Sequence, residues 1–510
     1  MSRPEMNVLL LIVDQWRGDT LGTLGHPCVR TPNFDRLAAE GVTFTRHYAQ
    51  SSPCGPSRAS MLAGQYLMNH RVITNDTPTA AHRKTMSRFM REAGYEPALI
   101  GYTTTVPDPR VAHANDPRFT TNTIADGWNI VRDFEGEREH YMAYLSGLGY
   151  DIPKKYVDIF QPPKGTDESL RLAPSPIRKE HSETAWSVDA ALDYIRIRKD
   201  EPWCLHLGTY RPHPPFMAPT PYDAMYDPAA MPAPLRAPDL AAEKQVHPLT
   251  HLLLEHVKAS NAVRHWPGLA SAIDLEGIAK IRAAYYALCT EVDDHLGRVF
   301  DLLRATGQDE RTLVILTSDH GEQLGDHYMV SKRGYFPQSY HIPCIVRDPR
   351  PAANGTRGRK YGVFTENVDV LPTILDWLGE PLPHQFDGYS LLPFVHGAPP
   401  ARWRKAARYE YDFRDMASRK AAAALGIDPE ATSLACVLDD DFAYIHFAQL
   451  PPLLFDLKAD PNWLNNVAEE ARYQPVALKY ARQMLDWRLT YADRTLTGLA
   501  ISSDGLRGHA

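Results

Sequence analysis

One short stretch of this chain combines a cysteine, a proline and an arginine at a spacing suited to chemistry. Residues 52–62 read Ser-Pro-Cys-Gly-Pro-Ser-Arg-Ala-Ser-Met-Leu and contain the pattern Cys-x-Pro-x-Arg. Pro56 suits the first turn of a helix, so we expect the Cys54 side chain at a helix N-terminus, where free N–H groups favour an anion. Arg58 follows one helical turn later. Taken alone, the pattern is equally compatible with a buried structural cysteine and a surface arginine.

Two aspartates that follow predicted strands form the second chemical feature. The apolar run Asn7–Val13 predicts a central strand of a mostly parallel sheet, and Asp14-Gln15 comes directly after it. The run Thr312–Thr317 predicts another strand, which is followed by Ser318-Asp319-His320-Gly321-Glu322. Ligands bind at the carboxyl edge of such sheets. A single aspartate there is usually a turn or helix cap, but two of them alongside Cys-x-Pro-x-Arg make a strong constellation.

These stretches resemble the sulfatases and their relatives in the alkaline phosphatase superfamily, in which the cysteine of Cys-x-Pro-x-Arg is oxidised to formylglycine, an aldehyde. The resemblance includes Asp14, Cys54 with Ala59-Ser60-Met61-Leu62, Ser318–Glu322 and Phe455–Pro461, and it therefore covers nearly the whole chain. It implies an α/β fold like that of alkaline phosphatase. A large mixed sheet would be sandwiched by helices, and a smaller C-terminal subdomain would contain an antiparallel sheet.

The resemblance also implies a metal site. One divalent cation, acting as a Lewis acid, would be held by Asp14, Gln15, Cys54, Asp319 and His320. Ordinary sulfatases have aspartate where this chain has Gln15, and often asparagine where it has His320. Because imidazole suits transition metals whereas calcium prefers oxygen ligands, we expect manganese, with calcium or zinc as alternatives.

The resemblance assigns roles to four residues around the nucleophile. Hydrated formylglycine at position 54 is a geminal diol, of which one hydroxyl attacks phosphorus or sulfur and the second later expels the ester from carbon. Arg58 would orient the diol and balance its charge. Lys332 would contact the transferred group or the leaving oxygen, and His213 would be the general acid. His213 lies between two prolines, so a loop spacer is the alternative interpretation.

The neighbouring substitutions bear on the substrate. Ordinary sulfatases carry Gly-Lys-Trp-His where this chain reads Gly101-Tyr102-Thr103-Thr104, so Tyr102 and Thr104 replace a lysine and a histidine, and Asn75 adds a neutral amide. Fewer cations favour singly charged esters. We therefore expect hydrolysis of phosphonate monoesters and phosphodiesters, with promiscuity toward sulfate monoesters, as in the phosphonate monoester hydrolases. An arylsulfatase with phosphonate side activity is the alternative, and an inactive metal-binding relative is opposed by the intact Cys54 constellation.

Periodic patterns predict the elements that position these residues. Segments with helical periodicity or helix end signals are 34–40, 84–93, 183–198, 275–306, 370–378 and 476–491, and segments typical of strands are 42–48, 97–101, 203–208, 408–411, 434–438 and 442–447. Residues 102–179 have little periodicity and are expected to form long loops over the active face. We expect a catalytic domain over 1–399, with an irregular insertion at 217–275, and a C-terminal subdomain over 400–510.

Composition narrows the class of protein further. The chain has 510 residues and a formal net charge of −7, which gives no basic surface for nucleic acid. No apolar run is long enough to span a membrane. Six scattered cysteines and the absence of a signal-peptide cleavage pattern predict a reducing cytoplasm. The resemblance implies a formylglycine-generating enzyme as a partner, and a homo-oligomer, either a dimer or a tetramer, with the tail Thr495–Ala510 in its contacts.

Overall fold

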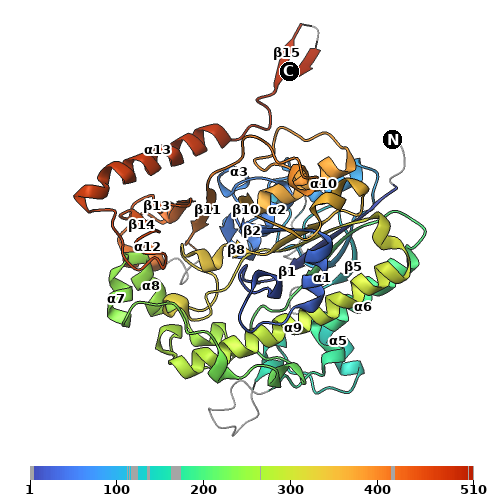
Figure 1. Ribbon diagram of the computed structural model, residues 1–510, viewed down its shortest axis with the longest axis horizontal. Coiled ribbons are helices and arrows are strands. Elements are labelled where there is room, and N and C mark those ends of the chain that lie inside the picture. Colours follow the sequence, from blue (N-terminus) through green and yellow to red (C-terminus); the bar gives the residue numbers. More distant parts are fainter. Residues whose placement is uncertain are drawn as a thin grey trace.

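A large mixed sheet forms the centre of the molecule (Figure 1). The computed structural model describes residues 5–111, 113, 115–116, 124–134, 138–161, 174–264, 266–414, 420–503 and 505–508. Within these residues the strand order is β10-β2-β9-β7-β1-β6-β4-β5, and β8 pairs with β2. Strand β1 (Asn7–Val13) lies between β7 (Thr312–Ser318) and β6 (Cys204–Thr209) and is parallel to both. All three are buried throughout, as expected for apolar runs covered on both faces.

The outer strands make the sheet mixed. The parallel part continues through β4 and β5, whereas β9 is antiparallel to both β7 and β2. Strand β2 is parallel to β10 and antiparallel to β8. The bounds of these strands are β2 Val42–Tyr48, β4 Ala98–Gly101, β5 Asn129–Asp133, β8 His341–Ile342, β9 Cys344–Arg347 and β10 Arg359–Glu366. The expected fold class, a large mixed α/β sheet, is confirmed.

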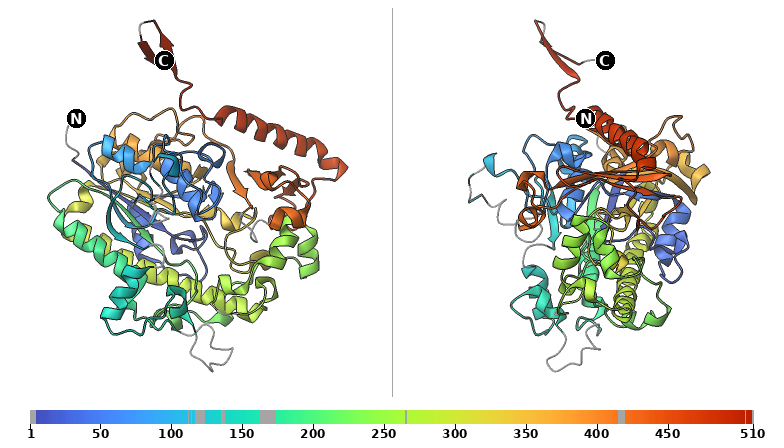
Figure 2. Two further views of the ribbon diagram at one scale, coloured as in Figure 1. Left: turned by 180° about the vertical axis from the view of Figure 1, so that it is seen from behind. Right: turned by 90° about the vertical axis from the view of Figure 1, so that its left-hand side faces the viewer.

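Helices cover both faces of this sheet, as the views in Figure 2 show. Along β1, Leu9 and Leu11 pack with α1, α6 and α9, whereas Val8 and Leu10 pack with α2, α4 and α10 on the opposite face. The helices are α1 Pro32–Glu40, α2 Cys54–Ala63, α3 Leu67–His70, α4 Met86–Glu92, α5 Glu139–Gly147, α6 Glu183–Ile197, α7 Leu240–Gln245, α8 Pro248–His256, α9 Leu275–Ala305, α10 Val370–Leu378, α11 Leu392–Val395, α12 Lys420–Leu425 and α13 Gln474–Tyr491. Among the described residues, no helix combines the length and the apolar character that a membrane span requires.

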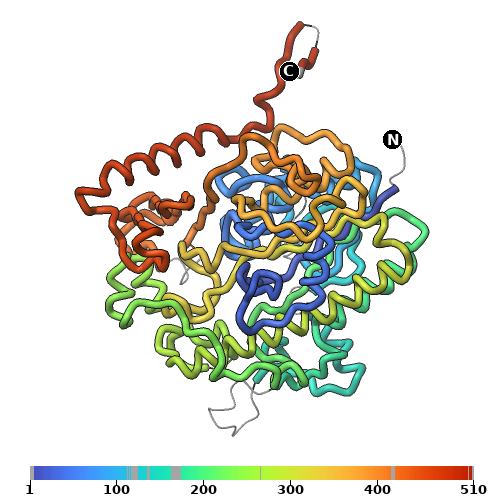
Figure 3. Tube along the Cα trace, viewed as in Figure 1, coloured from blue at the N-terminus to red at the C-terminus, as the bar shows by residue number. Residues whose placement is uncertain are grey.

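The smaller C-terminal sheet is joined to a strand from the N-terminal part of the chain. Its order is β14-β13-β12-β11-β3, in which β11 to β14 are antiparallel and β3 (Ser51–Ser52) pairs in parallel with β11 (Ala407–Asp412). The other strands are β12 Ser433–Leu438, β13 Phe442–Phe447 and β14 Leu453–Asp456. One face packs on α13, and the other meets α8, as the path of the chain in Figure 3 shows. At this contact the His247 ring stacks on Phe447 at 4.2 Å. Because β3 ends two residues before Cys54, the small sheet helps to place the cysteine.

Two segments contain more regular structure than their composition predicts. Residues 102–179 were expected to be loops, but they carry the edge strand β5 and helix α5; residues 162–173 lie outside the described part. The segment 217–275, expected to be irregular, contains α7 and α8. In the second segment the difference has a local reason. The side chains of Asp239 and His247 cap α7 and α8, and Pro248 begins α8, so these short helices depend on end signals more than on apolar periodicity.

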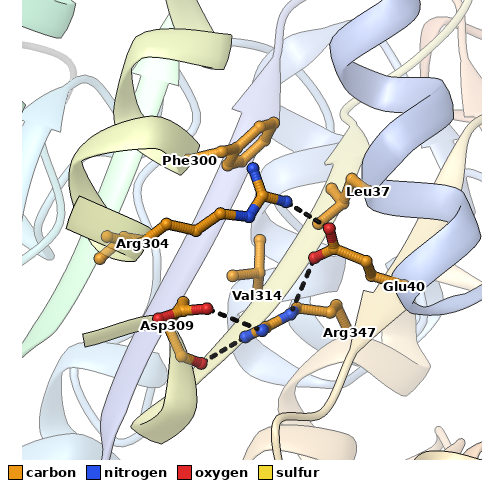
Figure 4. A pocket seen from close by; sticks show the side chains of 8 residues that line it. Leu37, Glu40, Phe300, Arg304, Asp309, Val314 and Arg347 are labelled. Atoms are coloured by element: carbon orange, nitrogen blue, oxygen red, sulfur yellow. Dashed lines mark hydrogen bonds and ion pairs between the residues drawn. The ribbon is translucent and has the colours of Figure 1, made fainter. Parts of the chain in front are cut away.

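The amino edge of the main sheet is closed by charged side chains around a small cavity (Figure 4). The cavity has a volume of about 20 Å³. Arg304 pairs with Glu40, and Arg347 pairs with Glu40 at 3.5 Å and with Asp309 at 3.6 Å. A space of this size holds about one water molecule. It lies near the start of β7, whereas the residues with catalytic potential follow the other end of that strand.

Candidate active site

Four buried side chains converge at the carboxyl edge of the main sheet. Potential ligand atoms of Asp14, Cys54, Asp319 and His320 all lie within 4.8 Å of one another. Asp14 follows β1 and Asp319 follows β7, and the two strands are paired up to Val13 and Ser318. Parallel strands end at the same edge, so their pairing brings the two carboxylates together. The first residue of α2, Cys54, completes the group, which we call the metal-ligand cluster.

The surroundings of Cys54 make its thiol a poor nucleophile. Its Sγ lies 3.1 Å from Nε2 of His320. Burial raises the pKa of the Cys54 thiol, and the negative charge of Asp14 adds to this effect. Burial therefore disfavours the thiolate, which is the reactive form of cysteine.

The next residue, Gly55, allows the chain around Asn75 and Thr104, two candidate substrate-binding residues, to approach the start of α2. Its backbone N–H donates to Oδ1 of Asn75 at 2.9 Å. A Cβ at position 55 would lie 2.8 Å from Cα of Asn75 and 2.9 Å from the carbonyl oxygen of Thr104. Only glycine avoids these clashes. The close approach places the 75 and 104 segments directly against the helix end that carries residue 54.

The cluster has the donor chemistry of a divalent cation site. The imidazole Nδ1 of His320 lies 3.1 Å from the Gly321 carbonyl oxygen, so Nδ1–H donates there and the Nε2 lone pair faces Cys54 and the carboxylates. Burial lowers the pKa of His320 to about 3, which keeps the ring neutral as metal ligation requires. Oδ1 of Asp14 is buried without a hydrogen-bond partner. An orphaned carboxylate oxygen is costly, and a cation would satisfy it.

A buried arginine holds the two carboxylates from behind. Arg58 is fully buried, so the alternative of a surface arginine is wrong. Its Nη2 lies 3.1 Å from Oδ2 of Asp14, and its Nε lies 2.9 Å from Oδ2 of Asp319. Burial and the charge of Asp319 still raise the pKa of Asp14 to about 6. Two like charges in a buried site repel each other, and a positive charge beside Oδ1 of Asp14 would relieve that repulsion.

Gln15 and Lys332 lie beside the cluster as a bonded pair. Lys332 Nζ donates to Oε1 of Gln15 at 2.6 Å, and Nε2 of Gln15 donates to Glu322. Gln15 as a metal ligand stays a prediction, because its side-chain oxygen already accepts from Lys332. Glu322 also accepts from the backbone N–H groups of Leu324 (3.1 Å) and Ser331 (2.5 Å), and it thus fixes both ends of the loop that leads to Lys332. This role of Glu322 was missed, although the residue lies in the Ser-Asp-His-Gly-Glu segment.

Tyr102 and Thr104 are the two neutral residues that stand where ordinary sulfatases have a lysine and a histidine. Their surroundings differ. The Tyr102 hydroxyl donates to Oδ2 of Asp14, and its backbone carbonyl accepts from Arg58 at 2.8 Å. Tyr102 therefore positions a residue of the cluster. Thr104 has a positive φ of 50°, and its hydroxyl is buried without a hydrogen-bond partner. Strained residues and buried polar groups without a partner are both common at functional sites.

His213 lies on the loop after β6, held by residues that the sequence did not single out. Its Nδ1 lies 2.8 Å from the Pro214 carbonyl oxygen. Arg211, which is buried, donates to the carbonyl oxygens of His213 (2.9 Å) and Pro215 (2.7 Å) and pairs with Glu183 at 2.6 Å. Burial lowers the pKa of His213 well below its usual value, and the charge of Lys332 contributes. Lys332 is thus within electrostatic reach of His213. In the sequence, the only indication of a role for Arg211 is its place in the Arg-Pro-His-Pro-Pro stretch that contains His213.

Comparisons with known proteins identify the family of the chain and several of its relatives. A family profile described as sulfatase matches residues 6–380, and one described as N-sulphoglucosamine sulphohydrolase, C-terminal, matches residues 325–490. The chain is 44% identical, over 98% of both chains, to the multifunctional alkaline phosphatase superfamily protein PehA of Trinickia caryophylli. It is similar to the crystal structure of the phosphonate monoester hydrolase of Agrobacterium radiobacter, with a TM-score of 0.95, 39% identity and coverage of 99% of this chain and 100% of that one. The phosphonate monoester hydrolase of Silicibacter pomeroyi gives a TM-score of 0.92 and 36% identity over 99% of both chains.

Proposed function

Because the chain belongs to the sulfatase family of the alkaline phosphatase superfamily, we propose that it hydrolyses phosphonate monoesters and phosphodiesters, using a divalent metal ion and formylglycine at position 54. The observation that carries this proposal is the meeting of residue 54 with Asp14, Asp319 and His320 in one buried cluster. The similarity to two phosphonate monoester hydrolases over nearly the whole chain supports the choice of substrate. Sulfate monoesters are proposed as secondary substrates, and an arylsulfatase is the alternative that the family name suggests.

The metal ion would be held by Asp14, residue 54, Asp319 and His320, with Gln15 as a further predicted ligand. When bound, the cation supplies positive charge that stabilises the anionic oxygens of nucleophile and substrate. A set of two carboxylates and one imidazole favours manganese, with calcium and zinc as the alternatives that metal analysis of the purified protein distinguishes. Arg58 keeps the outer carboxylate oxygens engaged, so that Oδ1 of Asp14 stays directed to the cluster.

The remaining residues act on the two sides of the scissile bond. Hydrated formylglycine supplies the hydroxyl nucleophile that the protonated Cys54 thiol lacks. Lys332 brings a positive charge to the transferred group, and its contact with Gln15 holds it in place. His213 donates to the Pro214 carbonyl through Nδ1, so the proton for the leaving oxygen would be carried on Nε2 of the protonated ring. The hydroxyl of Thr104 and the amide of Asn75 would contact the substrate as neutral groups.

Replacement of Cys54 tests this proposal directly. Purified wild-type protein and Cys54→Ala are compared for turnover of an aryl phosphonate monoester, and the oxidation state of residue 54 is read from peptide mass. We expect turnover to follow the fraction of formylglycine and Cys54→Ala to lose about a thousandfold or more in kcat. Cys436→Ala, which changes a buried cysteine of the small sheet, is the control and should remain active. A fully active Cys54→Ala protein contradicts the proposal.

We also propose a cytoplasmic protein whose Cys54 is oxidised by a formylglycine-generating enzyme. All six cysteines are free, which supports a reducing compartment. Cysteine does not become an aldehyde without an oxidising enzyme, so this partner follows from the proposed nucleophile. Expression with and without a formylglycine-generating enzyme, followed by peptide mass of residue 54, tests the dependence.

A homo-oligomer, either a dimer or a tetramer, is the assembly that we propose. On α13, Leu478, Leu485 and Leu489 are 54%, 57% and 71% exposed, and their spacing places them on one side of the helix. The adjoining hairpin of β15 (Leu499–Ser502) and β16 (Gly505–Gly508) projects from the body in Figures 1 and 2. A second copy would cover this apolar surface. Leu485→Glu with Leu489→Glu should lower the molar mass in light scattering, whereas Lys479→Glu should not.

A further inference from the structure

A cavity of about 680 Å³ lies between the segment that follows β1, strands β2, β8 and β10, and helix α9. The described residues that line it include neither Lys332 nor His213, and none of the metal-ligand cluster. Leu24, Pro27 and Leu235 give the cavity apolar walls. Because binding sites for small organic molecules have volumes of this order, the cavity is a candidate site that the proposed reaction does not use.

Tyr286 of α9 brings a hydroxyl without a partner to this cavity. The residue is 3% exposed, and its ring meets that of His26 edge to face at 4.7 Å. The hydroxyl makes no hydrogen bond with the described residues, yet it is not one of their enclosed polar atoms, so it faces the open space of the cavity. Burial raises the pKa of Tyr286, which keeps the hydroxyl protonated, and the charges of Arg282 and Arg17 act on it. A buried tyrosine hydroxyl usually has a partner, and a ligand in the cavity would supply one.

His26 and Arg17 add two further donors. Nδ1 of His26 accepts from the backbone N–H of Val29 at 3.0 Å, so the proton of the neutral ring is on Nε2. Nε of Arg17 donates to Asp19 at 2.8 Å and Nη1 donates to Asp326 at 2.7 Å, while Nη2 has no acceptor in the described part of the chain. Both side chains line the cavity. Three donors therefore meet there without an acceptor from the protein.

The charged residues of the cavity leave one positive charge in excess. Asp19 and Asp326 both pair with Arg17, and Asp326 also pairs with Arg282 at 2.6 Å. The third cation, Lys360, forms no ion pair with the residues that the structure describes. Burial lowers the pKa of both histidines that line the cavity, so they add no charge at pH 7. Three cations against two carboxylates attract a ligand with a single negative charge.

We propose that this cavity binds a small organic carboxylate, whose oxygens accept hydrogen bonds from Arg17, His26 and Tyr286. A carboxylate has two oxygens with about four acceptor positions and no donor of its own, which matches a set of donors without acceptors. Its one negative charge balances the one excess positive charge, and its carbon body packs against the apolar walls. Inorganic phosphate has more charge and no apolar body, so it fits less well. The inference does not depend on the proposed reaction.

Calorimetric titration with benzoate, and with benzamide as its neutral match, tests the proposal. The wild-type protein should bind benzoate with a Kd of about 1 mM or lower and benzamide about tenfold more weakly. Tyr286→Phe removes only the hydroxyl and should weaken benzoate about tenfold, and Lys360→Met should weaken it about threefold. Tyr222→Phe and Lys280→Met are the matched controls. Their polar groups contact Asp294 at 3.0 Å and Glu276 at 2.7 Å, outside the cavity, and both variants should bind benzoate like the wild type.

A variant of the metal-ligand cluster separates this cavity from the candidate active site, where a carboxylate could also bind. Benzoate should bind a folded Asp319→Asn protein as tightly as it binds the wild type, and loss of binding in that variant overturns the proposal. Absence of wild-type binding at about 10 mM benzoate, equal affinity for benzoate and benzamide, or an unchanged affinity in a folded Tyr286→Phe protein overturns it as well. Tighter binding of inorganic phosphate than of benzoate would rule out a carboxylate as the ligand.

Discussion

The two oxygens of Asp14 differ in a way that defines the site. Oδ2 accepts from Arg58 at 3.1 Å and from the Tyr102 hydroxyl, whereas Oδ1 is buried without a partner. Asp319 is held on both oxygens, by Arg58 on one side and by the backbone N–H of Gln15 on the other. These hydrogen bonds fix the orientation of both carboxylates. One buried acceptor is left for a ligand that the chain itself does not supply.

Thr104 offers a residue-scale test in which stability and activity should separate. Thr104→Val keeps the shape and removes a buried hydroxyl without a partner, so the free energy of unfolding should stay constant or rise by about 1 kcal/mol. If the hydroxyl binds substrate, kcat/KM should fall about tenfold. Thr103→Val is the control. Its hydroxyl bonds Thr105 and the Ala125 N–H, so this variant should lose stability. An unchanged kcat/KM in Thr104→Val would remove Thr104 from the substrate site.

The low pKa of His213 predicts a pH dependence of defined sign. Burial, assisted by Lys332, lowers this pKa well below 6.5, so the ring is mostly neutral at pH 7. Above its pKa, the protonated fraction grows about tenfold for each unit of decreasing pH. The ratio of kcat/KM for poor against good leaving groups should therefore rise from pH 8 to pH 6.5. His213→Asn should show a lower and flat ratio. A wild-type ratio independent of pH would argue against a general acid at this position.

At the scale of elements, the loop between β7 and β8 is anchored by a buried ion cluster. Asp326 accepts from Arg17 at 2.7 Å, from Arg282 at 2.6 Å and from the backbone N–H of Leu235 at 2.7 Å, and its side chain is 2% exposed. These contacts tie the loop to the segment after β1 and to α9. Lys332 comes six residues after Asp326, so the contacts of Asp326 fix the path of the chain to the lysine.

A pair of aspartate variants tests this anchor. Asp326→Asn removes the charge that two arginines share, and it should lower the free energy of unfolding by about 3 kcal/mol. Asp19→Asn is matched, because Asp19 also pairs with Arg17 at 2.8 Å but is 49% exposed, and it should cost less than about 1 kcal/mol. Denaturant unfolding measures both. Equal losses of unfolding free energy in the two variants would show that Asp326 does not anchor the loop.

The elements that the sequence predicts best are those with continuous apolar runs and clear end signals. The bounds of β1 and α10 agree with expectation, because continuous apolar runs and end signals define them locally. Strands β5 and β9 were missed. The first has an exposed, charged edge pattern, and the second becomes a strand only by pairing with β7 and β2. Similarly, the motif pointed to Arg58, but the anchoring by Glu322 and Arg211 depends on contacts between segments far apart in the chain.

At the scale of the whole molecule, metal binding should couple to folding. The proposed ligands come from the ends of β1 and β7 and the start of α2, which meet only in the folded chain. Manganese at 100 times its Kd should therefore stabilise metal-stripped protein by about 2.7 kcal/mol. Thermal unfolding with and without the ion measures the shift. Asp319→Asn should abolish it, whereas Asp309→Asn at the amino edge should not. A shift that survives in Asp319→Asn would place the metal elsewhere.

The central claim is that one site uses formylglycine and a metal ion to hydrolyse singly charged phosphorus esters. The most direct test is a substrate panel on metal-loaded protein whose residue 54 is confirmed as formylglycine by peptide mass. The panel compares kcat/KM for an aryl phosphonate monoester, a phosphodiester, a phosphate monoester and a sulfate monoester with the same leaving group. We predict that the phosphonate and the diester lead, with the sulfate behind them and the doubly charged phosphate poorer. A sulfate monoester that leads by orders of magnitude would contradict this account and identify an arylsulfatase.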